Sequence, residues 1–413
     1  MSKLEELIQE LCPDGVETFP LEECCNILDK KRKPVTKNSR EKGEYPYYGA
    51  NGVQDYVSDY IFNGKFVLVG EDGSVITKSG TPVVTWAEGK IWVNNHAHVI
   101  EEKSGTMLRY LYFYIQTIDV TSLIHGNIPK LTGRDFRSLK IALPPLEIQR
   151  EIVSILDNFT ELTAELTAEL TARKTQYTYY RDKLLANSYK GEIKQLEECC
   201  DSIADGDHQA PPKADSGVPF ITISDIDERH EINLNVTKYV PDEYYNRLAD
   251  KRRPQKGDVL YTVVGSYGIP VYISENKRFV FQRHIAILRP NNAVIDSRYL
   301  YHAMNGTAFH RQADLAAKGA AQKTIGLASL AKMTVPVPPL DVQNRIVNVL
   351  DNFEKICSDL NIGLPAEIEA RQKQYEYYRD KLLTFAETGN TILNGTERNG
   401  TERNGTERNG TEL

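Results

Sequence analysis

The stretch with the clearest capacity for chemistry lies near the N-terminus, where cationic side chains stand next to aromatic and amide ones. Residues 28–42 (LDKKRKPVTKNSREK) carry seven basic and two acidic residues. Residues 43–52 (GEYPYYGANG) follow directly, with three tyrosines and one asparagine among glycines. Cations reach phosphates, while amide and planar side chains meet base edges, so the pairing indicates a nucleic-acid contact. A charge run on its own is more often a solvated face.

A second basic cluster in the other half of the chain strengthens this interpretation. It comprises Lys251, Arg252, Arg253 and Lys256, and further basic residues follow at 277–284. Two segments, 126–136 and 320–330, align at the repeat offset of 194 residues just before the helical segments, and each adds amide and basic residues. The predicted DNA contacts are Lys30, Lys31, Arg32, Lys33, Tyr47, Tyr48, Asn51, Asn95, His96, Asn127 and Lys130 in the first half, and Lys251, Arg252, Arg253, Ser266, Tyr267, Arg283, His284, Gln322 and Lys323 in the second.

Catalytic motifs are missing from the sequence. It contains no G-x-G-x-x-G, P-loop, H-E-x-x-H or G-x-S-x-G pattern. Its Pro-Pro pairs lack the preceding Asn or Asp and the following aromatic residue with which an amino-methyltransferase stacks a flipped base. His96 and His98 could share one face of a strand and bind a metal, and GEDG (70–73) could be a carboxylate site. Polar strand residues and a turn are the favoured interpretations, so no catalytic residue and no metal site are predicted. Ser266-Tyr267-Gly268 is as compatible with a phosphate cradle as with a plain turn.

Composition limits the class of protein. With 40% hydrophobic and 26% charged residues, the chain of 413 residues is ordinary for a soluble protein of two or three domains. We find no apolar run of about 18 residues and no signal-peptide core, which predicts a cytoplasmic location. The six cysteines include two adjacent pairs and are expected to be reduced. The net charge of −7 excludes a uniformly basic surface but allows a local cationic groove.

The sequence contains an internal duplication. LPPLEIQREIVSILDNF (143–159) returns as VPPLDVQNRIVNVLDNF (337–353), and QYTYYRDKLL (176–185) returns as QYEYYRDKLL (374–383). LEECC occurs at 21–25 and again at 196–200. The predicted organisation is a variable domain at 1–142, a helical segment at 143–190, a second variable domain at 191–336, a second helical segment at 337–387 and a disordered NGTER-repeat tail at 388–413. Strands are expected at 66–70, 81–86, 98–100, 219–223, 258–265 and 284–290.

The helical segments carry apolar residues at steps of mostly three and four, which is a coiled-coil seam. No proline interrupts 147–209, so one helix of about 40 residues is possible, roughly 60 Å long. Gly363-Leu364-Pro365 predicts a break in the second segment. The residues expected to pack helices or dock partners are Leu162, Leu166, Leu170, Tyr177, Tyr180, Leu184, Tyr375, Tyr378 and Leu382.

Taken together, these motifs resemble the specificity subunit of Type I restriction-modification enzymes. The resemblance rests on the two PPL-helix segments, the two QYxYYRDKLL segments, YPYYGANG with GEDG, and a TAEL repeat (163–170). It implies an α/β (α+β) fold with two target-recognition domains separated by long helices that pack as an antiparallel coiled coil. It also implies double-stranded DNA, two methyltransferase subunits and two restriction subunits as partners. S-adenosylmethionine, ATP and Mg²⁺ would be bound by those subunits and not by this chain.

The TAEL repeat has a physical interpretation as a ruler. Four added helical residues lengthen a helix by about 6 Å and rotate it by a net angle of about 40°. One base pair of B-DNA advances about 3.4 Å and about 34 to 36°. A TAEL unit would thus move one recognition domain along and around the duplex while Leu162, Leu166 and Leu170 stay in the seam. The alternatives are a coiled-coil adaptor that binds proteins through its variable domains, and a self-contained nuclease or methyltransferase.

Overall fold

The computed structural model describes residues 3–73, 75–187, 192–206, 211–320, 322–358 and 363–388. They form two compact units, one from Met1–Ala164 and Ala370–Leu413, the other from Glu165–Glu369. The predicted tail lies outside the described residues from 389 onward. None of the described helices is long and apolar enough to cross a membrane.

The first unit is built around a six-stranded sheet. Its strand order is β2 (Asn26–Ile27), β7 (Ala97–Glu101), β5 (Phe62–Gly70), β6 (Val84–Val93), β3 (Lys42–Gly49) and β4 (Gly52–Val57). Two small pairs join β1 (Thr18–Pro20) to β10 (Lys140–Ala142) and β8 (Ile124–His125) to β9 (Lys130–Leu131). The helices are α1 (Lys3–Leu11), α2 (Leu21–Cys24), η1 (Asp29–Lys31), η2 (Lys37–Ser39), α3 (Leu108–Ile115), η3 (Thr121–Leu123) and α4 (Gly133–Arg137).

The second unit divides its strands between separate sheets. A four-stranded sheet has the order β12 (Cys200–Asp205), β18 (Ile285–Pro290), β15 (Val259–Thr262) and β16 (Pro270–Tyr272). A three-stranded sheet has the order β14 (Tyr239–Val240), β13 (Val218–Ile221) and β17 (Val280–Phe281), and β11 (Glu192–Gln195) pairs with β19 (Thr334–Val337). The helices are α6 (Leu196–Cys199), η5 (Ile223–Asp225), α7 (Asp242–Arg247), η6 (Asp250–Arg252), α8 (Ser297–Met304), α9 (Thr307–Ala316) and α10 (Leu327–Ala331).

All six predicted strands are present, with shifted ends. The prediction at 81–86 starts too early, because β6 begins at Val84. Pro82 has no N–H to donate to a sheet, which fits this later start. The prediction at 258–265 runs too far, because β15 ends at Thr262 and the chain then turns.

The long helices follow the repeats. α5 is one uninterrupted helix of 42 residues, Leu146–Asn187. α11 covers Leu340–Ser358 and α12 covers Leu364–Thr388, so the helix break predicted at Gly363-Leu364-Pro365 is confirmed. Pro365 lies in the first turn of α12, where a proline costs no intrahelical hydrogen bond.

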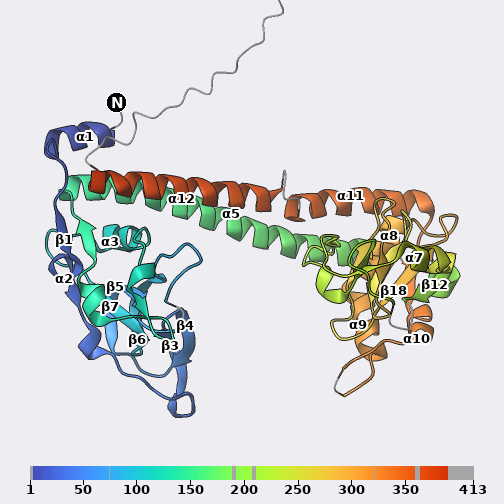
Figure 1. Cartoon of the computed structure of the whole chain (residues 1–413). Helices are drawn as coiled ribbons and strands as arrows, with labels where there is room; N and C mark the ends of the chain where they lie inside the picture. Colours follow the sequence, from blue (N-terminus) through green and yellow to red (C-terminus); the bar gives the residue numbers. More distant parts are fainter. Residues whose placement is uncertain are drawn as a thin grey trace, which may run out of the picture. The chain divides into compact units, whose positions relative to one another are not determined.

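Within each unit two of these helices pack side by side, antiparallel to each other (Figure 1). In the first unit Phe159 of α5 stacks on Tyr378 of α12, with ring centroids 5.4 Å apart. In the second unit Phe353 of α11 stacks on Tyr180 of α5 at 5.7 Å. Phe159 and Phe353 hold the same position in their repeats, and so do Tyr180 and Tyr378. The duplicated motifs therefore pair crosswise, and the predicted α+β fold with antiparallel helix pairs is confirmed.

The seam residues differ in burial. Leu382 is buried, and Leu162, Leu166, Leu170, Tyr177, Leu184, Tyr375 and Tyr378 are half-buried. Tyr180 leaves 38% of its surface exposed even though one face covers Phe353. The glutamates of the TAEL segment, Glu161, Glu165 and Glu169, are exposed.

A buried glutamine in each repeat fastens the variable part of each unit to its helix. Gln149 accepts a hydrogen bond from the Met107 N–H (2.8 Å) and donates to the carbonyls of Gly105 and Pro144. Gln343 does the same with the Asp296 N–H (2.7 Å) and the carbonyls of Val294 and Pro338. Met107 and Asp296 precede the first residues of α3 and α8. One amide therefore fixes where each of these short helices begins.

Further along α5 and α11, an aspartate in each pairs with an arginine in the first turn of the short helix. Asp157 pairs with Arg109 of α3 at 2.7 Å, and Asp351 pairs with Arg298 of α8 at 2.8 Å. Each arginine also lies over aromatic rings of its unit, among them Trp86 in the first. α3 and α8 are thus equivalent helices, docked by equivalent contacts.

Replacing Gln149 by leucine should destabilise the first unit by about 2–4 kcal/mol, because one buried N–H and two buried carbonyls lose their partner. Urea denaturation followed by circular dichroism measures the change. Gln9→Leu, at an exposed position of α1, is the matched control and should leave the midpoint within error. Equal midpoints for both variants would show that the Gln149 amide does not fasten α3.

Candidate nucleic-acid interface

In the first unit, three chain segments meet at the end of β5. The Glu71 N–H donates to the His96 carbonyl (2.8 Å), and the Glu71 carbonyl accepts from the Leu131 N–H (2.9 Å). Two residues on, the Gly73 N–H donates to the Pro129 carbonyl at 3.0 Å. These backbone bonds hold the turn at 94–96 and the hairpin at 124–131 against residues 71–73. They bring together segments that are far apart in the sequence.

The second unit repeats this arrangement bond for bond. The Val263 N–H donates to the His284 carbonyl (2.9 Å), and the Val263 carbonyl accepts from the Ile325 N–H (2.8 Å). The Gly265 N–H donates to the Lys323 carbonyl at 2.9 Å. Because the pattern uses backbone atoms alone, it survives almost complete divergence of the side chains. His96 and His284 are therefore equivalent residues, although no sequence motif relates them.

We call the exposed and half-exposed side chains around each set of bonds the junction surface of that unit. Many of the predicted DNA contacts gather there. In the first unit they are Asn95, His96, Asn127 and Lys130, and in the second Ser266, Tyr267, Arg283, His284, Gln322 and Lys323. Burial lowers the pKa of His284, and the charge of Arg283 lowers it further, so this imidazole is neutral near pH 7.

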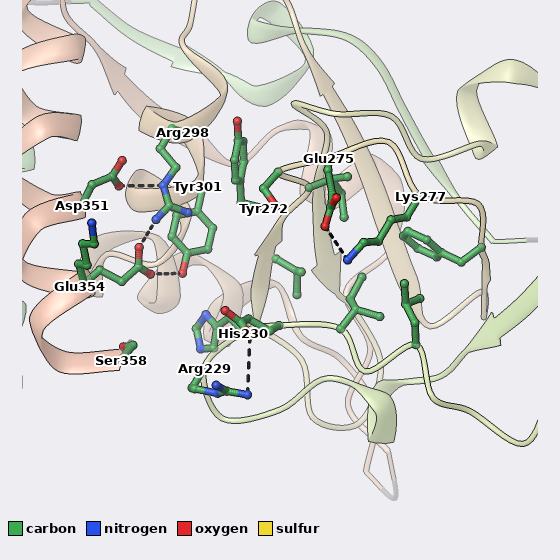
Figure 2. Close-up of a pocket in the computed structure, with 18 residues that line it drawn as sticks. Arg229, His230, Tyr272, Glu275, Lys277, Arg298, Tyr301, Asp351, Glu354 and Ser358 are labelled. Atoms are coloured by element: carbon green, nitrogen blue, oxygen red, sulfur yellow. Dashed lines mark hydrogen bonds and ion pairs between the residues drawn. The ribbon is translucent and has the colours of Figure 1, made fainter. Parts of the chain in front are cut away.

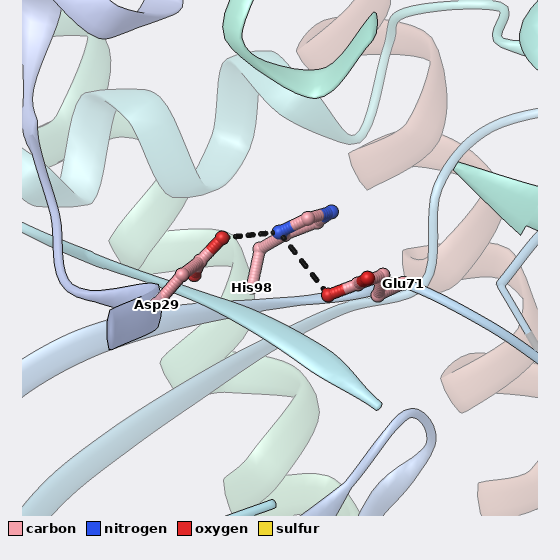
Figure 3. A group of neighbouring side chains, drawn as sticks. All are labelled: Asp29, Glu71 and His98. Carbon is pink, nitrogen blue, oxygen red and sulfur yellow. Dashed lines mark hydrogen bonds and ion pairs between the residues drawn. The ribbon is translucent and has the colours of Figure 1, made fainter. Parts of the chain in front are cut away.

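Asp29, Glu71 and His98 lie close together in the first unit (Figure 3), and the cations Arg32 and Lys130 join this cluster. The buried His98 bonds Asp29 at 2.7 Å, while Arg32 pairs with Glu71 at 2.6 Å. Lys130 also reaches Glu71, at 3.3 Å. Burial alone would raise the pKa of Asp29, but hydrogen bonding and charge from His98, with smaller contributions from the Val99 N–H and Arg32, hold it below its ordinary value. The cluster ties η1 to the end of β5.

Asp29, Glu71 and His98 have metal-ligand chemistry, but their surroundings do not fit a cation. The Arg32 guanidinium already occupies the space between Glu71 and Asp29. The second ring nitrogen of His98 faces the Leu131 carbonyl at 3.1 Å, and the ring stacks on Phe136. The idea that His96 and His98 share a strand face is wrong, because His96 lies in the turn before β7 and pairs with Asp72. GEDG lies at the end of β5, where Glu71 pairs with Arg32 and Asp72 pairs with His96, so both carboxylates make structural contacts.

Two predicted contacts are placed differently from expectation. Tyr47 is 1% exposed; its ring carries the Arg40 guanidinium at 4.1 Å and its hydroxyl bonds the backbone of Val35. Tyr48 is also buried, and burial raises the pKa of its phenol. These rings support the structure beneath the loop at 33–40 and do not present a face for base contact. The short sequence motif does not reveal which faces of strand β3 are covered, because that depends on segments far along the chain.

The remaining predicted contacts surround the junction or stand apart from it. Lys30, Lys31 and Lys33 belong to η1 and the turn that follows it, and Asn51 is exposed in the β3–β4 turn. Arg32 is half-buried and serves the carboxylate cluster. In the second unit Lys251 is exposed, Arg252 lies 3.6 Å from Asp205, and Arg253 is half-buried in the turn after η6. Sequence reasoning did not single out Arg40, and it did not give Glu71 and Asp72 their partners, Arg32 and His96.

The second unit also contains a cavity of about 660 Å³ beside α8 and α11 (Figure 2). On the side formed by α8 and α11, the polar groups satisfy one another: Arg298 bonds Asp351 and Glu354, and the Tyr301 hydroxyl donates to Glu354 at 2.6 Å. The same arginine excludes a cation from the group formed by His302, Asp351 and Glu354. This side of the cavity is the counterpart of the Arg109–Asp157 contact and serves to dock α8.

Comparison with known proteins agrees with the duplicated architecture. A family model described as the type I restriction modification DNA specificity domain matches the chain twice, at residues 13–173 and 190–370. The chain belongs to this family. The first match contains the junction of the first unit, and the second match contains the junction of the second unit.

Individual relatives agree with the family model over most of the chain. A Haemophilus influenzae protein named as a putative type I restriction enzyme specificity subunit is 35% identical over 399 residues, covering 93% of this chain and 98% of that protein. The Escherichia coli EcoR124I/EcoR124II specificity subunit is 34% identical, covering 69% and 72% respectively.

Solved structures show the same fold. The type I restriction-modification S subunit from M. genitalium has a TM-score of 0.53 at 14% identity, over 90% of this chain and 97% of that one. A chain from a study of complex assembly and conformational transition in the type I R-M system has a TM-score of 0.55 at 18% identity, over 90% and 98%.

The lowered pKa of Asp29 predicts an acid-sensitive contribution to stability. Because the folded pKa lies below the unfolded one, the contribution is complete above the ordinary carboxyl pKa of about 4 and is lost as the pH falls through the folded value. Thermal unfolding between about pH 6 and pH 3 should show the difference in Tm between wild type and Asp29→Asn shrinking at the acid end. Asp14→Asn, at an exposed position, is the control. A difference in Tm that stays constant with pH would contradict the stabilising role of the Asp29 carboxylate.

Proposed function

We propose that this chain is the DNA sequence-specificity subunit of a type I restriction-modification complex, and that each unit reads one half of a bipartite target. The observation that carries the proposal is the junction, which the chain builds twice from equivalent backbone hydrogen bonds. A duplicated scaffold with unlike exposed side chains is what two readers of different half-sites require.

The side chains of the junction surfaces suit DNA. Lys30, Lys31 and Lys33 provide cations for phosphates beside the first surface, and Arg283 and Lys323 do so on the second. Amide groups that can pair with base edges lie among them, such as Asn95, Asn127 and Gln322. Such a local cationic surface is compatible with a net charge of −7 because phosphate contacts depend on where charges lie.

The proposed division of labour leaves catalysis to partners. Residues 1–142 and 191–336 act as recognition domains, and the helical segments at 143–190 and 337–387 dock two methyltransferase subunits, which two restriction subunits join. S-adenosylmethionine, ATP and Mg²⁺ are then bound by those subunits. The lack of nucleotide-binding and catalytic motifs in this chain supports that division.

The helices also set the gap between the half-sites in this proposal. α5 crosses the TAEL segment without a break, and a helix of its 42 residues is about 63 Å long. Threonine is a weak helix former, so helix stability alone does not explain the repeated word. A four-residue step keeps the apolar stripe nearly in line while changing the length of the helix.

Deleting Thr163–Leu166 should shorten the unspecified gap of the methylated target and leave both half-sites unchanged. The deletion removes a net rotation of about 40°, which corresponds to about one base pair. Sequencing the modified adenines in a host that carries the variant and its methyltransferase partner measures both features. Altered half-site bases with an unaltered gap would refute the role of α5 as a ruler.

Replacing Lys30, Lys31 and Lys33 by alanine should weaken DNA binding uniformly across sequences. It should also reduce the salt slope by up to about three, roughly one for each phosphate that no longer has a lysine beside it. Gel shifts of the complex with its methyltransferase partner at several salt concentrations provide the measurement. A triple alanine variant of Lys3, Lys103 and Lys140, exposed lysines of the same unit, is the control.

The same experiment separates the proposal from its main rival, a coiled-coil adaptor that binds protein partners through its variable domains. Binding of the wild-type complex to DNA that is weak and insensitive to salt would favour the adaptor.

A further inference from the structure

An exposed isoleucine lies on the first junction surface, so packing in a core does not explain the choice of an apolar residue there. Ile128 has 68% of its surface exposed, in the turn between β8 and β9. Its neighbours Asn127 and Lys130 are polar and basic. Single exposed apolar residues are common on protein surfaces, so exposure alone assigns no role. The rigid turn around Ile128 and the equivalent position in the second unit do suggest a role.

The turn that carries Ile128 is fixed from both sides. β8 and β9 pair Ile124 with Leu131 and His125 with Lys130, and Gly126 has a φ of +88°. The Pro129 carbonyl, directly after Ile128, accepts the Gly73 N–H. Lys130 is tied to Glu71. The isoleucine is therefore held in place on the same surface as the predicted DNA contacts.

The second unit places Gln322 at the corresponding position. The Lys323 carbonyl accepts the Gly265 N–H, just as the Pro129 carbonyl accepts the Gly73 N–H. Gln322 directly precedes Lys323, and Ile128 directly precedes Pro129. Gln322 is exposed too, and its amide lies over Gly265, where a β-carbon would come within 3.3 Å of Nε2. One backbone position thus carries an aliphatic side chain in one unit and a carboxamide in the other.

We propose that this position reads a base in each half-site: Ile128 contacts the 5-methyl group of a thymine, and Gln322 pairs with N6 and N7 of an adenine, both in the major groove. The inference rests on the proposed DNA-reading function. An isoleucine has no hydrogen bond to give to phosphate or sugar, and the thymine methyl is the apolar group on a major-groove base edge. A glutamine carboxamide matches the donor and acceptor pair of adenine.

The thymine contact can be tested by removing the methyl group from the DNA. Once adenine sequencing has given the target, each thymine of the half-site assigned to the first unit is replaced by deoxyuridine. The wild-type complex with its methyltransferase partner should lose affinity, about fivefold or more, at one position. Ile128→Ala should lose affinity for the natural target and become indifferent to that replacement. Ile193→Ala, at another exposed isoleucine (57%), should behave like wild type.

The amide contact is tested in the other half-site. Gln322→Ala should relax the base preference at one position, with the first half-site and the gap unchanged.

The outcomes separate the inference from the function on which it rests. No bipartite modified target for the wild type would overturn the proposed function. A bipartite target with wild-type binding indifferent to every deoxyuridine replacement would overturn the Ile128 contact alone. A target left unchanged by Gln322→Ala would overturn the amide contact.

Discussion

Three backbone hydrogen bonds at the end of one strand determine where the candidate base-reading side chains stand. In the first unit the bonds of residues 71 and 73 join the end of β5 to the turn at 94–96 and the hairpin at 124–131. In the second unit the bonds of residues 263 and 265 join the end of β15 to His284 and to residues 323–325. Because every residue except proline offers the same backbone groups, the exposed side chains can be replaced without disturbing the scaffold. This explains how two units with little interior sequence in common present their residues from equivalent positions.

The long helices are held by side-chain contacts rather than by backbone hydrogen bonds between segments. Their contacts depend on particular side chains, and those side chains are repeated: the glutamines at 149 and 343, the aspartates at 157 and 351, and the phenylalanines that stack on tyrosines of the other repeat. A buried amide with three partners tolerates little change, since a replacement leaves backbone groups unsatisfied. The chain is therefore divided into repeated helices, which position the two units' variable parts, and variable junction surfaces, which are proposed to read DNA bases.

Much of this architecture could be predicted from the sequence, because it is written in local patterns. The repeated segments, the stripe on α5 and the break at Gly363 each depend on neighbours within a few turns. The burial of Tyr47 and the cluster of Asp29, Glu71 and His98 could not be predicted, because each depends on contacts between residues far apart. The importance of Gln149 and Gln343 could have been predicted, since they occupy the same position of a repeated motif. The equivalence of His96 with His284 was not, because it lies in backbone bonds that carry no residue signature.

Two equivalent scaffolds with unlike surfaces are proposed to read two unlike half-sites at a fixed separation. Sequencing the modified adenines in a host that carries the wild-type chain with its methyltransferase partner tests it most directly. We expect one target made of two different specified blocks with an unspecified gap of constant length. A single uninterrupted motif, or two identical blocks, would contradict it.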